Sequence, residues 1–444
     1  HACGIGKDSA TYCWGNAYHG QVGDGTVGYR LAPTLVMGQT PPTPTPTVPS
    51  AFSSVAAGGS HACGLSASGI AWCWGAGASG QIGDGTTTSR ATPVAVWNFP
   101  AFRTLALGGL HTCGIAIASG TYCWGDNSAG QLGNGASGQG MKHLNQSSPV
   151  AVVSDVSFIS LVAGWVHTCG LTAQSDAYCW GDRYSGQVGD GPVSGYGRDR
   201  TSPVKVSGGL KFTSITAGGN HTCGLTASGS AYCWGWNSSG QVGDGTTTNQ
   251  YTPVAVSGSI TFRALTARDY HTCGIATSGV AYCWGRNDSG QLGDGSRVNR
   301  QIPTKVVTTR TFVSLALGEG FTCGLTGDGI RTCWGANASG QFGDGTTESS
   351  STPRTLTGLR QFSSLVAGDA FACGQSGQAG WSCWGDNTDG QLGDGTSASK
   401  AVPTRVQISQ TFASISVGGN HTCALTAASE AWCWGANESG QIGD

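Results

Sequence analysis

Eighteen cysteines carry the most reactive side chains of this 444-residue chain, and they fall into nine pairs with one spacing. The members of each pair are ten residues apart and none is left over: Cys3 and Cys13, Cys63 and Cys73, Cys113 and Cys123, Cys169 and Cys179, Cys223 and Cys233, Cys273 and Cys283, Cys323 and Cys333, Cys373 and Cys383, Cys423 and Cys433. Zinc knuckles need cysteines only about two to four residues apart, and the sequence has none. Regularly paired thiols indicate disulfides, which persist in oxidising surroundings. We therefore predict nine disulfides and a secreted or cell-surface protein.

Seven histidines share one position, two residues before the first cysteine of a pair: His1, His61, His111, His167, His221, His271 and His421. Equivalent histidines in a ring could bind a metal ion. Two copies have Phe321 and Phe371 at this position, which a required metal ring would not tolerate. We therefore interpret the histidines as partly buried imidazoles that hydrogen-bond to the backbone. We predict neither a metal site nor a cofactor.

An aspartate recurs in the motif GDG or its truncated form, and Asn134 replaces it once: Asp24, Asp84, Asp190, Asp244, Asp294, Asp344, Asp394 and Asp444. Calcium is the alternative reading of these carboxylates, but the spacing is not that of an EF-hand loop. Asparagine and aspartate both offer a side-chain oxygen to nearby backbone N–H groups. The pattern therefore favours an Asx turn.

Three acidic residues interrupt the repeat. Asp269, Glu319 and Asp369 stand where other copies have Gly59, Gly109, Gly219 and Gly419. Arg268 and Tyr270 flank the first of them, and Phe321 and Phe371 lie two residues beyond the other two. We predict an acidic strip beside exposed aromatic side chains that binds a cation, a basic partner or a sugar. The alternative is a solvated turn in which glycine is not needed.

These residues belong to a tandem repeat of about 50 residues, which is the first feature to seek in such a chain. The first cysteines of successive pairs are 60, 50, 56, 54, 50, 50, 50 and 50 residues apart, which defines nine copies. Copy five reads KFTSITAGGNHTCGLTASGSAYCWGWNSSGQVGDGTTTNQYTPVAV and contains four short extended stretches with no helical period. Cys223 and Cys233 are symmetric about Ser228, which predicts an antiparallel hairpin with a three-residue loop and a left-handed Gly229. The tryptophan after each second cysteine is expected to pack between units.

The motifs HTCGL, AYCWG and SGQVGDGT followed by TPV resemble the regulator of chromosome condensation repeat family over essentially the whole chain. The resemblance implies a β-propeller of four-stranded blades, usually seven. Its members include a nucleotide exchange factor, a plant ultraviolet photoreceptor and a secreted β-lactamase inhibitory protein, and the cysteine-paired version is most similar to secreted bacterial members. Exchange and chromatin activities are not carried over because there is no basic tail. Trp165 alone does not make a light sensor.

The expected fold is all-β, with nine repeats of antiparallel four-stranded blades in a closed ring or an open superhelical array, or as a stretch of a longer chain. Closed propellers typically have about four to eight blades. We expect a single repeat domain over 1–444, with partial copy one at 1–37, a Pro/Thr-rich spacer at 38–50, copies two to eight at 51–409 and partial copy nine at 410–444. The chain opens at His1 without Met, so we expect a processed or truncated product.

Composition narrows the function. The chain has 75 glycines, only 46 charged residues (22 basic plus 24 acidic) and a formal net charge of −2, so we expect no nucleic-acid partner and no membrane insertion. No asymmetric cluster of catalytic residues stands out. We predict a non-catalytic extracellular scaffold that binds a protein or glycan, or assembles head to tail into a fibre. The alternatives are a secreted enzyme acting on polysaccharide and a secreted protein inhibitor.

Overall fold

The computed structural model describes residues 2–5, 11–16, 29–35, 52–96, 101–136, 145–192, 199–356, 361–377, 380–407 and 412–442. The chain divides into two compact units, His1–Pro49 and Ser50–Asp444, where the sequence led us to expect a single domain. The boundary coincides with the end of the predicted spacer at 38–50. The first unit contains one antiparallel sheet in the order β1 (Ala2–Ile5), β2 (Thr11–Asn16) and β3 (Tyr29–Leu35).

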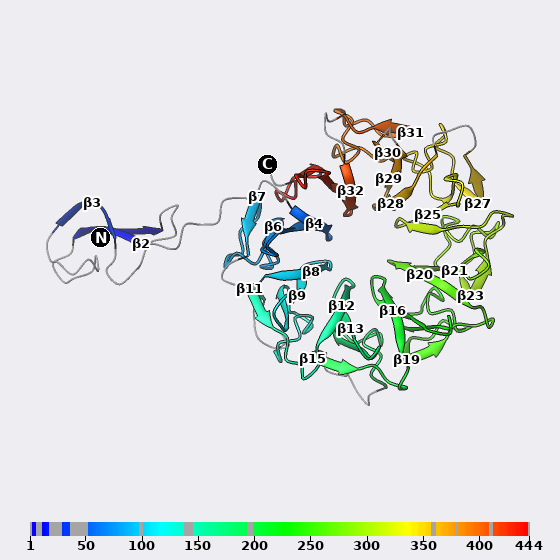
Figure 1. The fold of residues 1–444 in the computed structure, drawn as a ribbon, viewed down its shortest axis with the longest axis horizontal. Helices are drawn as coiled ribbons and strands as arrows, with labels where there is room; N and C mark the ends of the chain where they lie inside the picture. The colour runs from blue at the N-terminus through cyan, green and yellow to red at the C-terminus, as the bar shows by residue number, and fades with distance from the viewer. Residues whose placement is uncertain are drawn as a thin grey trace. The chain divides into compact units, whose positions relative to one another are not determined.

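The second unit contains eight antiparallel sheets, one from each of copies two to nine, arranged in a ring (Figure 1). Seven of these blades have four strands in chain order, and the copy-nine blade has three. The first strand of each blade lies innermost: β4 (Phe52–Ala57), β8 (Phe102–Leu107), β12 (Phe158–Ala163), β16 (Phe212–Ala217), β20 (Phe262–Arg268), β24 (Ser314–Leu317), β28 (Ser364–Ala367) and β32 (Phe412–Val417).

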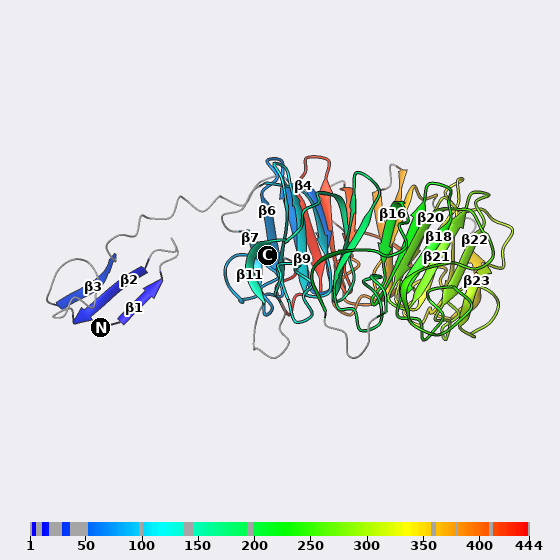
Figure 2. The same ribbon diagram turned by 90° about the horizontal axis from the view of Figure 1, so that it is seen from below.

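The remaining strands follow outward in the same order, and Figure 2 shows them side on. The second strands are β5 (His61–Ser66), β9 (His111–Ala116), β13 (His167–Thr172), β17 (His221–Thr226), β21 (His271–Ala276), β25 (Phe321–Leu325), β29 (Phe371–Ser376) and β33 (His421–Thr426). The third strands are β6 (Ala71–Gly75), β10 (Thr121–Gly125), β14 (Ala177–Gly181), β18 (Ala231–Gly235), β22 (Ala281–Gly285), β26 (Arg331–Gly335), β30 (Gly380–Gly385) and β34 (Ala431–Gly435). The outer strands are β7 (Arg90–Ala95), β11 (Gln146–Ala151), β15 (Arg200–Lys205), β19 (Gln250–Ala255), β23 (Arg300–Lys305), β27 (Ser350–Thr355) and β31 (Lys400–Arg405). No helix among the described residues is long and apolar enough to cross a membrane.

The cysteine register predicted for each hairpin is confirmed in eight copies. Cys223 faces Cys233 across β17 and β18, their Cα atoms are 4.1 Å apart, and a disulfide joins them. The same bond is present in the other seven blades, where it joins Cys63 to Cys73, Cys113 to Cys123, Cys169 to Cys179, Cys273 to Cys283, Cys323 to Cys333, Cys373 to Cys383, and Cys423 to Cys433.

The ninth predicted disulfide belongs to the first unit. Cys3 and Cys13 are opposite each other in the backbone register of β1 and β2, but their side chains lie outside the described part of the chain. The loop of the hairpin is also as the sequence predicts. Gly229 has a φ of 78°, which confirms the left-handed residue between the two cysteine strands of copy five.

The ring closes between copy nine and copy two, so both the nine-bladed ring and the open array are wrong. The backbone N–H of Phe52 in copy two donates to the carbonyl of Ser429 in copy nine. The same bond joins consecutive copies elsewhere, for example from the N–H of Phe262 in copy six to the carbonyl of Gly229 in copy five. Phe52, Trp74 and Leu425 share one buried apolar cluster. Eight blades complete the circle because the inner strand of copy two meets the hairpin of copy nine, which leaves no place for a ninth.

A buried core lies at each interface between neighbouring blades. At the interface between copies four and five, the Cys169–Cys179 disulfide packs with Phe212 and Trp234 of the next blade. The Trp234 ring is fully buried, and its centroid lies 5.7 Å from that of Phe212. The expectation that this tryptophan packs between units is therefore confirmed. The other interfaces repeat the arrangement.

In copies two to six the repeated histidine bonds to a side chain of the next blade, where the sequence predicted a backbone partner. His167 Nε2 lies 3.0 Å from Thr222 Oγ1, whose hydroxyl donates to the carbonyl of Gln187 at 3.2 Å. Trp234 Nε1 donates to the same carbonyl at 2.9 Å. Because the hydroxyl proton goes to the carbonyl, the histidine must be the donor through Nε2–H. We call this set of three bonds the interface relay, and it joins copies two to seven in sequence.

Candidate functional site

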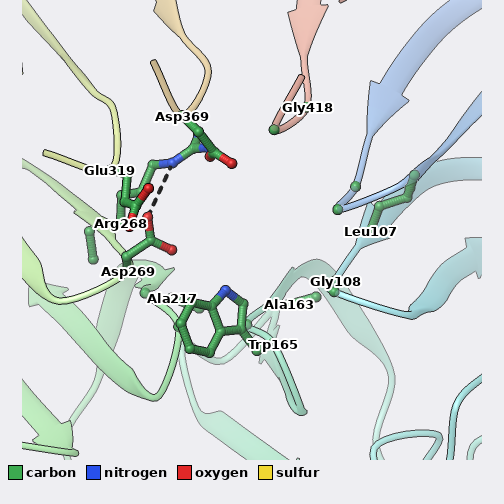
Figure 3. A pocket seen from close by; sticks show the side chains of 18 of the residues that line it. Leu107, Gly108, Ala163, Trp165, Ala217, Arg268, Asp269, Glu319, Asp369 and Gly418 are labelled. Carbon is green, nitrogen blue, oxygen red and sulfur yellow. Dashed lines mark hydrogen bonds and ion pairs between the residues drawn. The ribbon is translucent and has the colours of Figure 1, made fainter. Parts of the chain in front are cut away.

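The turns that join the first and second strands of the blades come together at the centre of the ring, and we call the space between them the mouth. They enclose a cavity of about 490 Å³. One side is lined by glycines, among them Gly108 and Gly418, and the opposite side by the polar side chains of Arg268, Asp269, Glu319 and Asp369 (Figure 3). The repeat therefore builds a symmetric opening, and the departures from the repeat make its lining asymmetric.

The three predicted acidic residues do meet in this cavity. Asp269, Glu319 and Asp369 come from three consecutive blades and all line its wall. Arg268 spans the copy-seven blade, donating from Nη2 to Asp369 and from Nη1 to the carbonyl of Ala367, the latter at 3.1 Å. Its Nε lies 3.7 Å from Asp269 Oδ2, and Figure 3 shows these groups together. With three carboxylates and one guanidinium, the lining has a formal charge of −2.

The backbone of copy six explains how Asp269 and Tyr270 are placed. Here β20 is one residue longer than β16, Arg268 pairs with His271, and Asp269 adopts a φ of 42°. Aspartate tolerates this left-handed conformation better than most residues do. Burial raises the pKa of Asp269, Arg268 opposes that shift, and Asp369 and Glu319 add to it. Burial also raises the pKa of the Tyr270 phenol, and the nearby Asp269 charge acts in the same direction.

Trp165 is the mouth residue whose place the sequence analysis missed. It belongs to the copy-four turn, and its backbone N–H donates to the carbonyl of Gly219 at 3.0 Å. A Cβ on Gly219 would lie 3.0 Å from the indole ring, so glycine is what allows the ring to lie over the copy-five turn. The indole meets Tyr270 edge to face, with centroids 5.4 Å apart. The available signal was that Trp165 replaces the repeated glycine just as the three acids do.

The prediction that aromatic side chains are exposed beside the acids is wrong for Phe321 and Phe371. Phe321 and Phe371 are both fully buried, whereas we expected them to be exposed beside the acids. They occupy the place of the relay histidine, and each packs in the apolar core between two blades. Ala372 stands opposite Phe321 in place of the threonine, whereas Thr422 is retained opposite Phe371 and donates to the carbonyl of Gln391.

The predicted Asx turn is present at Asp84, Asn134, Asp244, Asp294, Asp344 and Asp394. Asp190 is followed two residues later by Pro192, which has no N–H, and pairs with Arg183 and Arg200 instead. Asp24 and Asp444 lie outside the described residues. Asp244 Oδ1 accepts from the N–H of Thr246 at 3.0 Å, and Asn134 Oδ1 accepts equivalently from Ala136 at 3.2 Å. Asp84 and Asp294 are in addition paired with Arg90 and Arg300. In the described ranges, no group of three histidine, cysteine or acidic side chains has the arrangement of a metal site.

Eight disulfide-bonded blades in a closed ring, with an asymmetric mouth at its centre, define the second unit as a closed β-propeller. A family model described as "RCC1-like domain" matches residues 194–444, more than half of the chain. Two models described as "Regulator of chromosome condensation (RCC1) repeat" match residues 52–81 and 158–187, and residues 68–115 and 120–171. The chain therefore belongs to the RCC1-like domain family, as its motifs led us to expect.

Curated relatives align over limited parts of the chain. The probable E3 ubiquitin-protein ligase HERC4 of Homo sapiens is 34% identical over 101 residues, which are 22% of this chain and 9% of HERC4. The ultraviolet-B receptor UVR8 of Arabidopsis thaliana is 28% identical over 198 residues, 44% of each protein. The chain thus covers less than half of the length of either relative.

Solved structures support the fold. Human WBSCR16 superposes with a TM-score of 0.65 at 18% identity, covering 80% of this chain and 99% of that one. Yeast RCC1 (Prp20), in its structure bound to Kap60, gives a TM-score of 0.62 at 18% identity, covering 88% of this chain and 92% of that one. At this level of identity the likeness concerns the propeller fold.

Proposed function

We propose that this chain is a non-enzymatic binding propeller of the cell exterior, and that its mouth receives a basic segment of a protein partner. The observation that carries the proposal is the mouth lining, which has a formal charge of −2 in a cavity of about 490 Å³. A concave site with an excess of one charge raises the local concentration of oppositely charged ligands.

Two features support the protein partner and the location. Yeast RCC1 binds Kap60 in its crystal structure, and Prp20p of Saccharomyces cerevisiae is described with binding properties to Gsp1p and histones. The eight disulfides suit an oxidising compartment. The expected fibre depended on the free ends of an open array. Because copies two to nine form a closed ring, we propose binding rather than fibre formation.

Calorimetry with a decalysine peptide tests the proposal, with a decaglutamate peptide and a neutral oligosaccharide as comparison ligands. We expect decalysine to bind and its affinity to fall as salt rises, because exposed charges are screened. The triple variant Asp269→Gly, Glu319→Gly and Asp369→Gly should lose this binding and still fold, because other copies have glycine at the same position. Binding of the oligosaccharide alone, or equal binding of decalysine to the triple variant, would contradict the proposal.

A further inference from the structure

Two aromatic rings from different blades form a corner inside the mouth. The ring planes of Trp165 and Tyr270 are at 89° and their centroids are 5.4 Å apart. Trp165 comes from copy four and Tyr270 from copy six, and the indole crosses the intervening blade over Gly219. Two perpendicular rings present two π faces to one small volume, and such faces attract cations.

One wall of this corner already contacts a cation. The guanidinium carbon of Arg286 lies 5.9 Å from the centroid of Tyr270, and Asp288 holds that guanidinium at 2.7 Å. Trp165 is 41% exposed. In the described part of the chain, no lysine or arginine lies over the Trp165 ring. The indole therefore offers a free face toward the cavity.

The charges beside the corner are incompletely balanced. Arg268 is engaged with Asp369, and its contact with Asp269 is longer, at 3.7 Å. Glu319 makes no ion pair with any described residue. Within the same ranges no side-chain group is arranged for a metal ion. The complement to two π faces and two carboxylates is therefore an organic cation.

We propose that the corner of Trp165 and Tyr270 binds a methylated ammonium group. Alkylated ammonium ions are the cations that aromatic cages recognise. Asp269, adjacent to Tyr270, and Glu319 supply the negative field. The inference rests on the proposed function only in placing the ligand in the mouth. Two sources share this chemistry, a methylated lysine of a protein and a free quaternary amine.

Calorimetry with three probes tests the inference: a peptide carrying trimethyllysine, the same peptide with the uncharged tert-butyl isostere of that side chain, and tetramethylammonium chloride. We expect the trimethyllysine peptide to bind at least tenfold more tightly than its uncharged isostere, because only the former is a cation. Binding of tetramethylammonium with comparable affinity would assign the site to free amines. Preference for the peptide would assign it to a methylated protein.

The matched variants are Trp165→Gly and Trp432→Tyr. The first restores the glycine found in copies two, three, five and nine, and the second restores the tyrosine found in copies three to six outside the mouth. We expect at least a tenfold loss of affinity for Trp165→Gly and no change for Trp432→Tyr, with thermal unfolding confirming that both fold. Equal binding of the uncharged isostere, or full binding by Trp165→Gly, would overturn the inference. Decalysine reports separately on the proposed function, since either ligand can bind without the other.

Discussion

The interface between copies four and five and the interface that closes the ring are built from the same repeat and are bonded differently. In the first, His167, Thr222 and Trp234 complete the relay to the carbonyl of Gln187. At the closure, Ala62 replaces the threonine, and neither His421 Nε2 nor Trp74 Nε1 has a partner among the described residues. The closure keeps its apolar cluster. The closure is therefore held by its apolar cluster and the backbone bond from Phe52 to Ser429, whereas most of the other interfaces add the relay.

A third interface shows how the relay is replaced without leaving one of its polar groups unpaired. Between copies seven and eight, Phe321 and Ala372 replace histidine and threonine together, so no polar atom of that pair is left unpaired. At the closure only the threonine is replaced. Each relay histidine also leaves one ring nitrogen unpaired, but the relay tryptophans donate to a carbonyl, whereas the buried Trp74 N–H at the closure has no partner among the described residues. An unpaired buried polar group costs about 1–3 kcal/mol. The closing interface is therefore the one we expect to open first.

Lowering the pH should have the largest effect on the stability of the blade interfaces, because each relay histidine is buried in its neutral form. Burial lowers the pKa of His61, His167 and His271 to about 3 and that of His111, His221 and His421 to about 4. Below the ordinary value of 6.5 the unfolded chain binds protons that the folded chain does not, so stability is retained above pH 6.5 and lost as the pH falls toward 4. Each histidine contributes about 1 kcal/mol per pH unit in this window, so we expect the thermal midpoint to drop steeply between pH 7 and pH 5.

The double variant His221→Phe with Thr272→Ala is the control for that experiment, because it copies the pair Phe321 and Ala372. This variant removes one buried histidine, so its thermal midpoint should fall less between pH 7 and pH 5, by the contribution of that one histidine. A thermal midpoint that is the same at pH 5 and pH 7 would contradict neutral, buried imidazoles.

Breaking one interior relay should have the second largest effect. Thr222→Val keeps the side-chain shape and removes the hydroxyl that accepts from His167, so we expect a loss of about 1–3 kcal/mol in the free energy of unfolding. Denaturant unfolding measures it. Thr422→Val is the matched control, since Thr422 bonds to the carbonyl of Gln391 and the preceding blade has Phe371 in place of the histidine. An equal loss in both variants would mean that the histidine bond contributes nothing.

Completing the relay at the closure should have the smallest effect on stability, and this change should increase the free energy of unfolding. In Ala62→Thr the new hydroxyl is expected to accept from His421 and donate to the Gln441 carbonyl, which should raise the free energy of unfolding by about 1 kcal/mol. Ala372→Thr should not raise the free energy of unfolding, because the new hydroxyl would face Phe321 and have no imidazole from which to accept a hydrogen bond. Equal stabilisation by both variants would show that the closing interface is not limited by its missing bonds.

Local features were predictable from the sequence because they depend on a few neighbouring residues. The register of Cys223 with Cys233 and the left-handed Gly229 follow from a ten-residue hairpin. The convergence of Asp269, Glu319 and Asp369 follows from their shared repeat position. These inferences needed only the period of the chain.

The rest depends on how one blade meets the next. The partner of His167 is Thr222, 55 residues away on another blade, and spacing within a copy does not contain that contact. Phe321 was expected to be exposed because it lies two residues beyond Glu319, but the interface between blades buries it fully. The number of blades depends on the angle between neighbours, which no single copy encodes.

The disulfides also determine how the ring would respond to a pulling force. Each one joins residues ten positions apart within a single hairpin, and none of those described links two blades. If a blade were drawn out from its ends, the segment between its cysteines would stay locked. A 50-residue repeat would then lengthen through about 40 residues, to about 140 Å rather than about 175 Å at about 3.5 Å per residue. Stretched blade by blade, the chain would lengthen in shortened steps, equal for the 50-residue repeats and slightly longer for copies three and four, and each step would leave a covalently closed hairpin from which its blade can re-form.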